Sequence, residues 1–195
     1  MAIILASTSP IRSKLLSSAG VNFQVHRPAV DETVLKRQHP HLSPKEIAGF
    51  LAREKSISLS AIYPGATIIG ADQTLWCDGT LFDKPGSIAE AASQLSLLRG
   101  RTHTLTSAIC CSLDAIPVWE YASEAQLTMR AFTDRFMRDY LETVASEALS
   151  TVGSYKLEGP GIQLFENIVG DYFTILGLPL LPLLGYLRTA GELDS

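Results

Sequence analysis

The chain has 195 residues, of which 46% are hydrophobic and 18% charged, a composition typical of a soluble globular protein. The net charge of −4 excludes a basic surface that would recruit nucleic acid in bulk, so no nucleic-acid partner is expected. Three cysteines, Cys77, Cys110 and Cys111, have a number and spacing that speak against a disulfide framework or a zinc site.

Apolar runs and helix caps predict a mixture of strands and helices. Helix starts are indicated by Ser9-Pro10 and by capping boxes at Ser43 and Ser87, and Asp78-Gly79 indicates a two-residue hairpin turn. In chain order, the predicted elements are a strand over 3–6, a helix over 10–19, a strand over 21–26, a polar loop over 27–42, a helix from 43 through 57, a strand over 66–71, a hairpin over 75–82, a helix over 87–100, two long strands over 103–113 and 118–132, a helix over 133–147, a glycine-rich loop over 152–161, short strands over 164–168 and 172–176, and a helix over 179–190.

This order predicts an α/β fold with a mixed sheet. The βαβ units at the start of the chain give parallel neighbours, whereas the long strands over 103–113 and 118–132 form an antiparallel hairpin. No internal repeat or clear linker interrupts the sequence, so residues 1–195 are expected to form a single domain.

No segment predicts export or membrane insertion. The opening Met1-Ala2-Ile3-Ile4 lacks a basic region, so no signal peptide is expected. The apolar run over 175–184 is too short to cross a bilayer and contains two prolines. We therefore expect a cytoplasmic protein without a membrane partner, in which the cysteines are buried thiols.

A candidate phosphate site lies where the first predicted strand meets the first predicted helix. A helix N-terminus offers unpaired backbone N–H groups to an anion. Ser7, Thr8 and Ser9 add hydroxyl donors, and Arg12 adds a guanidinium that can bind phosphate through two parallel hydrogen bonds. Ordinary helix capping is the alternative explanation, and the chain has no P-loop motif.

A candidate catalytic carboxylate follows the apolar run over 67–69. Asp72 comes after two small residues that leave room for Mg²⁺ or for a water molecule, although a turn aspartate is the alternative. Lys55 and Lys84 can neutralise a triphosphate together with Arg12, whereas each lysine alone fits a solvated surface. Glu32, in a polar loop, is either a metal ligand or a solvated carboxylate.

Two further side chains suit recognition of a base. Glu158 lies beside a glycine in a glycine-rich segment, where the backbone can approach a flat ligand closely. Its two oxygens can accept the adjacent N–H donors of a guanine Watson–Crick edge. The amide of Gln73 both donates and accepts, so it can contact another atom of that edge. A loop charge is the alternative for Glu158.

In combination these motifs resemble the Maf family of nucleotide pyrophosphatases along nearly the whole chain. No single motif is decisive, but their ordered combination is specific. The matching segments, in order, are residues 5–10 with Arg12 and Leu15-Leu16, then residues 30–32, 52–55, 70–73, 84–85, 153–155, 158–159, 170–172 and 177–180.

The resemblance implies an inosine-triphosphatase-like fold, with an elongated mixed sheet flanked by helices and a central cleft between two lobes. It implies hydrolysis of a nucleoside triphosphate to the monophosphate and pyrophosphate, with Mg²⁺ or Mn²⁺ as cofactor. Asp72 would be the proton acceptor and share the metal with Glu32, and a cytoplasmic homodimer is usual. Lys55 and Lys84 are the other implied catalytic residues, and the implied substrate contacts are Ser7, Ser9, Ile11, Arg12, Gln73 and Glu158.

The subgroup is indicated by three positions. Gln73 and Glu158 resemble the branch that acts on 7-methyl-GTP, whereas the branch that prefers dTTP and UTP has threonine and glutamine there. Ile11 stands where the 7-methyl-GTP branch has tryptophan, so it offers no cation–π attraction to a methylated base. The alternatives to a guanine-type pyrophosphatase are a dTTP- or UTP-preferring enzyme and a non-catalytic nucleotide-binding regulator of cell division.

Overall fold

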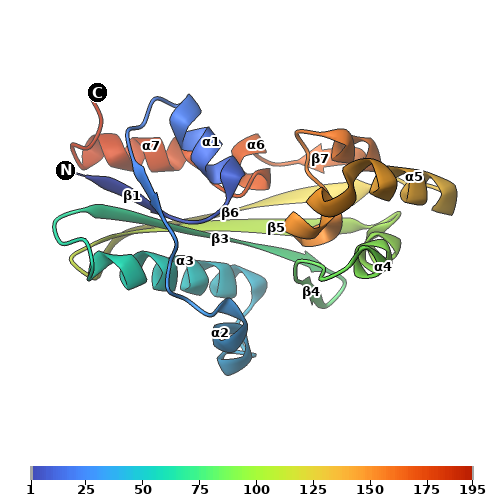
Figure 1. Ribbon diagram of the computed structural model, residues 1–195, viewed down its shortest axis with the longest axis horizontal. Helices are drawn as coiled ribbons and strands as arrows, with labels where there is room; N and C mark the ends of the chain where they lie inside the picture. Colours follow the sequence, from blue (N-terminus) through green and yellow to red (C-terminus); the bar gives the residue numbers. More distant parts are fainter. Residues whose placement is uncertain (1, 195) are drawn as a thin grey trace. The chain divides into compact units, whose positions relative to one another are not determined.

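Seven strands form one mixed sheet in the computed structural model, which describes residues 2–194 (Figure 1). The strand order is β2-β1-β3-β5-β6-β7, and β4 pairs with β3. β1 is parallel to β2 and β3, whereas the β3–β4 and β6–β7 pairs are antiparallel. The strands are β1 (Ile3–Ala6), β2 (Gln24–His26), β3 (Thr67–Cys77), β4 (Thr80–Phe82), β5 (Thr102–Leu113), β6 (Ile116–Met129) and β7 (Phe165–Val169).

Local capping explains where several helices begin. Ser43 and Glu46 form the predicted capping box, with the Ser43 Oγ accepting from Glu46 N and Ser43 N donating to the Glu46 carboxylate.

The predicted mixed α/β class with flanking helices is confirmed. The helices are α1 (Pro10–Ser18), α2 (Glu32–Gln38), α3 (Pro44–Ser60), α4 (Ile88–Leu98), α5 (Asp134–Val144), α6 (Tyr172–Ile175) and α7 (Leu180–Thr189), with short 3₁₀ helices over Ala145–Ser150, Val152–Ser154 and Pro160–Leu164.

The chain divides into two compact units. Unit 1 comprises residues up to 73, residues 106–123 and residues from 172 onward, and unit 2 comprises residues 74–105 and 124–171. Strands β3, β5 and β6 each contribute residues to both units. The predicted central cleft stays a prediction.

In unit 1, strand alternation decides which helix each side chain meets. Ile3 and Leu5 of β1 pack in a core cluster with residues of α1 and α7, whereas Ile4 packs with Leu59 of α3. Figure 1 shows α3 on one face of these strands and α1 and α7 on the other. By the same alternation, Asp72 of β3 faces α3 and its neighbour Gln73 faces the opposite side.

Helix α3 approaches β3 closely at Gly70. A Cβ atom at this position would lie 2.7 Å from Ser56 N and 3.0 Å from Ser56 Cβ, closer than packed atoms tolerate. Ala48 and Ala52 of α3 are fully buried, and their small side chains permit the same approach. The contact brings Lys55, which directly precedes Ser56 in α3, beside Asp72.

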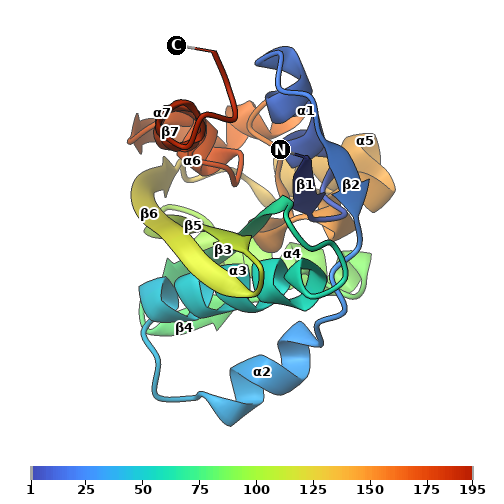
Figure 2. The same ribbon diagram turned by 90° about the vertical axis from the view of Figure 1, so that its left-hand side faces the viewer.

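Helix α2, unlike α3, is not packed into the core. It lies on the outer side of α3 (Figure 2) and contains no buried residue. Its start is set by Asp31, whose side chain accepts a hydrogen bond from Val34 N at 3.0 Å. The segment was predicted to be a loop, because a helix without a buried face shows no apolar periodicity.

Other predicted elements also differ in the structure: the strand predicted over 118–132 is β6, over Ile116–Met129, and the loop predicted over 152–161 contains 3₁₀ turns. The strand predicted over 21–26 shortens to β2, and the strand predicted over 66–71 continues to Cys77. The strand predicted over 172–176 is instead helix α6, because Tyr172 O accepts a helical hydrogen bond from Leu176 N at 3.1 Å. Aromatic and β-branched residues there favoured a strand, and tertiary packing overrides that weak preference.

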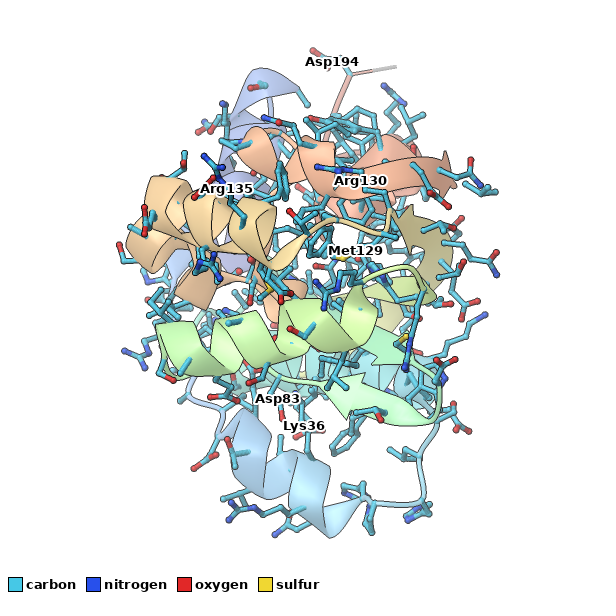
Figure 3. The ribbon with its side chains drawn as sticks, turned by 90° about the vertical axis from the view of Figure 1, so that its right-hand side faces the viewer. Lys36, Asp83, Met129, Arg130, Arg135 and Asp194 are labelled. Atoms are coloured by element: carbon cyan, nitrogen blue, oxygen red, sulfur yellow. The ribbon has the colours of Figure 1, made fainter. Side chains whose placement is uncertain are left out.

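In unit 2, α4 and α5 lie side by side (Figure 3). Thr133 Oγ1 caps α5 by accepting from Phe136 N at 3.2 Å. The guanidinium of Arg130, labelled in Figure 3, lies 4.2 Å from the centroid of the Phe136 ring, and its Nε donates to Gln163 O at 2.6 Å. These contacts attach the start of α5 to the end of β6 and to the 3₁₀ helix before β7.

His103 of unit 2 is buried and predicts a pH dependence of stability. Its Nε2 is hydrogen-bonded to the hydroxyl of Tyr155 at 2.7 Å, and burial lowers the pKa of His103 from 6.5 to about 4. Between about pH 4 and pH 6.5, His103 therefore binds a proton in the unfolded chain but not in the folded chain. The stability from neutral His103 is complete above pH 6.5 and is lost as the pH falls toward 4, by up to about 3 kcal/mol.

Urea unfolding at pH 7 and at pH 4.5 tests this expectation. The difference in unfolding free energy between the two pH values should shrink in His103→Gln and stay unchanged in His41→Gln, which alters an exposed histidine. An identical pH difference in the wild type and in His103→Gln would contradict it.

Candidate active site

In unit 1, the Lys55 ammonium joins two carboxylates. Its Nζ lies 2.5 Å from Asp72 Oδ1 and 2.7 Å from Glu32 Oε1. The side chains of Lys55 and Asp72 are each 7% exposed, whereas that of Glu32 is 46% exposed. The charged cluster is therefore buried at Asp72 and Lys55 and reaches solvent at Glu32.

Asp72 lies within β3, whereas the sequence predicted it just after a strand. Its position in the sheet still matches the predicted chemistry, because the neighbouring parallel strand β1 ends earlier. Ala6, the last residue of β1, pairs with Gly70, so β3 runs past β1 at Asp72 and Gln73. These side chains thus lie beside the carboxyl end of β1, the region where α/β proteins bind ligands.

Burial raises the pKa of Asp72 above that of an ordinary aspartate. The Lys55 ammonium opposes this shift, and the carboxylate of Glu32 reinforces it. A carboxylate with a raised pKa accepts a proton more readily than one at its ordinary value. The environment of Asp72 therefore suits a general base.

Arg12 extends from α1 to backbone acceptors on two other segments. Its Nε donates to Gly177 O and its Nη1 to Ala71 O, both at 2.8 Å, and Nη1 lies 3.4 Å from Ser7 Oγ. Two nitrogens of the predicted phosphate-binding group are thus used by the protein itself. Within residues 2–194, Nη2 donates to no protein acceptor, so it is the nitrogen that suits a ligand.

The residues before and inside the first turn of α1 have unequal roles. Ser7 is buried, and its Oγ accepts from Ser9 N at 3.1 Å, which shapes the entry to the helix. Ser9 occupies the N-cap position, but its side chain makes no capping hydrogen bond. The Ser9 hydroxyl is therefore not used to cap α1. Ile11 packs against the core cluster of unit 1.

Gln73 lies on the side of β3 opposite to Asp72, and its amide is bound by the protein. Its Nε2 donates to Ser107 Oγ at 3.0 Å, to Thr174 O at 3.1 Å and to Ile175 O at 3.0 Å. The sequence predicted a side chain that both donates to and accepts from a ligand. The donating half of the amide is instead held by β5 and α6.

Lys84 and Glu158 belong to unit 2. Lys84 is exposed on the loop between β4 and α4, which is held by Gln94 Nε2 donating to Asp83 O at 2.9 Å. An approach of Lys84 or Glu158 to the residues of unit 1 stays a prediction.

Glu158 lines a cavity of about 220 Å³ in unit 2. Tyr140 and Tyr155 contribute to its wall, and the Lys156–Glu147 ion pair, with a 2.9 Å N–O distance, lies at it too. Aromatic walls beside charged groups suit a planar ligand that carries hydrogen-bonding edges.

Metal binding has partial support from the side chains alone. Within residues 2–194, no cluster of three or more histidine, cysteine or acidic side chains is arranged to hold a metal ion. Glu32 and Asp72, however, both face the Lys55 ammonium. This donor set fits Mg²⁺, which proteins often hold through one or two carboxylates together with substrate phosphates and water.

Ser107 and Gly177 were not predicted as members of the site. Ser107 lies in an apolar strand, where a small buried polar residue attracts no notice in the sequence. Gly177 adopts a left-handed backbone conformation with φ +90° and offers its carbonyl to Arg12. The glycine within the motif over 177–180 was the one available signal, since only glycine adopts this conformation freely.

Fold and site together describe an α/β protein in which a lysine between two carboxylates and one nitrogen of Arg12 suit an anionic ligand. A family model described as Maf-like protein matches residues 2–190, and the chain belongs to this family. Within residues 2–194, no helix has the length and hydropathy needed to cross a membrane.

Two curated relatives match the chain over almost their full length. A 7-methyl-GTP pyrophosphatase of Rhizobium johnstonii is 46% identical, over 99% of this chain and 98% of the relative. A nucleoside triphosphate pyrophosphatase of Paramagnetospirillum magneticum is 45% identical, over 97% of this chain and 99% of the relative. Among solved structures, a nucleoside-triphosphatase / dITP/XTP pyrophosphatase from Mycobacterium abscessus matches with a TM-score of 0.39 and 18% identity, over 100% of this chain and 98% of that one.

Proposed function

We propose that this protein is a nucleoside triphosphate pyrophosphatase that hydrolyses its substrate to a nucleoside monophosphate and pyrophosphate. The observation that carries the proposal is the Lys55 ammonium held between Asp72 and Glu32, with a buried base at one end and solvent at the other. Relatives at 45–46% identity that bear this activity in their names support it.

In the proposed reaction, a water oxygen attacks the α-phosphorus. The bond from that phosphorus to the bridging oxygen breaks, and its electron pair leaves with pyrophosphate. Asp72 takes the proton of the attacking water, a role that its raised pKa favours. Lys55 and Nη2 of Arg12 stabilise the negative charge that develops on the phosphoryl oxygens.

Lys55 also balances negative charge in the site before the substrate binds. Its ammonium compensates two carboxylates that would otherwise repel each other in a partly buried site. Phosphate oxygens compete for the same ammonium, so substrate binding can free the carboxylates. Ser7 and Ser9 are proposed to flank the phosphates, and Lys84 to supply a further positive charge.

Glu32 and Asp72 are the residues proposed to hold a divalent cation. When bound, Mg²⁺ or Mn²⁺ polarises phosphoryl oxygens and offsets the charge of the triphosphate. The protein supplies two carboxylates for it, and the substrate supplies further oxygens.

The base is proposed to be of the guanine type. Glu158 lines the cavity of unit 2 and offers two acceptor oxygens, which match the adjacent N–H donors of guanine. Ile11 is engaged in the core of unit 1 and offers dispersion only, so we propose no strong preference for 7-methyl-GTP over GTP. A homodimer and a cytoplasmic location remain predictions.

A pyrophosphate-release assay with GTP, 7-methyl-GTP, dTTP and UTP tests the function. We expect both guanine nucleotides to be hydrolysed faster than dTTP and UTP in the presence of Mg²⁺. Removal of the metal with EDTA should lower the rate at least about 100-fold, and added Mg²⁺ should restore it. Binding of nucleotides without release of pyrophosphate from any of them would favour the regulator instead, and faster hydrolysis of dTTP and UTP would favour the pyrimidine-preferring enzyme.

A further inference from the structure

The side-chain amide of Gln73 has a fixed direction. The Ser107 hydroxyl donates its single hydrogen to Thr174 O at 2.7 Å, so towards Gln73 its oxygen can only accept. Thr174 O and Ile175 O also can only accept. The group that points at these three acceptors must therefore be the NH₂ of Gln73, because the reversed amide would set its oxygen against two carbonyl oxygens.

The opposite end of the amide, Oε1, is left for a ligand. Within residues 2–194, no protein group donates to Gln73 Oε1, although the side chain is only partly buried. The amide lies beside Gly177, where a Cβ atom would be 3.6 Å from Gln73 Cδ and 3.4 Å from Arg12 Nη2. The end of Gln73 and the ligand-facing nitrogen of Arg12 thus flank the same glycine.

We propose that Gln73 serves the substrate as a hydrogen-bond acceptor only, and that Ser107 is a positioning residue that holds the amide together with the carbonyl groups of Thr174 and Ile175. This inference rests on the proposed function and adds the direction of recognition to it. An acceptor at Gln73 takes an N–H or O–H donor of the nucleotide and repels a carbonyl oxygen or an imine nitrogen.

This polarity favours one class of base. The amino group of guanine has two hydrogens, of which the proposed contact with Glu158 uses one, so the second is left as a donor for Gln73. Uracil offers only one N–H, between two carbonyl oxygens. With the NH₂ of Gln73 held by Ser107 and the α6 carbonyls, the side chain cannot turn to serve those carbonyl oxygens. Ser107 is fully buried, so it acts through Gln73 and touches no substrate.

The test compares Ser107→Ala with Ser107→Thr, which keeps a hydroxyl, and with Ser112→Ala. Ser112 is a matched control, because it lies on the same strand, is equally buried, and its Oγ has no hydrogen-bond partner within residues 2–194. In Ser107→Ala the ratio of kcat/KM for GTP to that for UTP should fall about five-fold, which corresponds to one neutral hydrogen bond. The change should appear in KM, with kcat nearly unchanged.

Ser107→Thr should retain the wild-type ratio, and Ser112→Ala should leave it unchanged. A second readout is the solvent exchange of the Gln73 side-chain NH₂ protons by NMR, expected to be slow in the wild type and faster in Ser107→Ala. An equal loss of activity for GTP and UTP, or fast exchange in the wild type, would overturn the inference. Failure of the proposed function would look different, since the wild type would then release no pyrophosphate from either nucleotide.

Discussion

Asp72→Asn removes most pyrophosphate release and leaves the protein folded. Asparagine has nearly the same size as aspartate but cannot take up the proton of the attacking water. The Lys55 ammonium keeps its ion pair with Glu32, so the substitution leaves no unpaired buried charge. We expect kcat to fall by about 10³-fold, within the range that general-base catalysis contributes.

Steady-state pyrophosphate release from GTP, together with a thermal unfolding curve, measures both parts of this expectation. Asp114→Asn is the matched control, because it removes the same charge in unit 1 at the β5–β6 turn. There an asparagine oxygen can still accept from Gly65 N, as Asp114 Oδ1 does at 2.8 Å. Near-normal turnover in Asp72→Asn would exclude Asp72 as the base.

Gly70→Ala is expected to damage stability and turnover together. The added methyl group would lie 2.7 Å from Ser56 N, a backbone atom that cannot rotate away. Helix α3 must therefore move outward from β3, at a cost of about 1–3 kcal/mol, typical of overpacking. The shift would carry Lys55 away from Asp72, and displacement of a catalytic group by about 1 Å can lower kcat about 100-fold.

Gly49→Ala provides the control on the same helix. A Cβ atom at Gly49 meets no atom within 4 Å, so this substitution should stabilise α3 by about 0.5–1 kcal/mol and preserve turnover. Urea unfolding and kcat for GTP are measured for both variants. If Gly70→Ala were as stable and as active as Gly49→Ala, the close approach of α3 would have no part in positioning Lys55.

The elements of the fold that could be predicted are those with local signals. Ser43 predicts the start of α3, because a capping box involves only residues within one helical turn. Asp78-Gly79 predicts the hairpin, because a two-residue turn requires residues that adopt a positive φ. Helix α6 could not be predicted, since its aromatic and β-branched residues favour a strand in isolation. Helix α2 was not predicted because it buries no residue, and Asp31, which caps it in the structure, was not interpreted as a cap.

The site was predictable to the extent that side-chain type carries the chemistry. Asp72, Lys55 and Glu32 were each proposed separately, and unit 1 brings them into contact. The partners of Arg12 could not be found in this way, because they are backbone carbonyls of Ala71 and Gly177. Every residue has a backbone carbonyl group, so residue type does not indicate which carbonyl groups will accept hydrogen bonds from Arg12.

Successive residues of strand β3 in unit 1 point to opposite faces of the sheet. Two consecutive residues, Asp72 and Gln73, belong to separate packing environments, one shared with α3 and the other with β5 and α6. The proposed nucleotide contact, Gln73, can therefore be substituted without disturbing the proposed base, Asp72, on the reverse side. One pleat of β3 therefore separates the proposed hydrolytic step from the proposed recognition of the base.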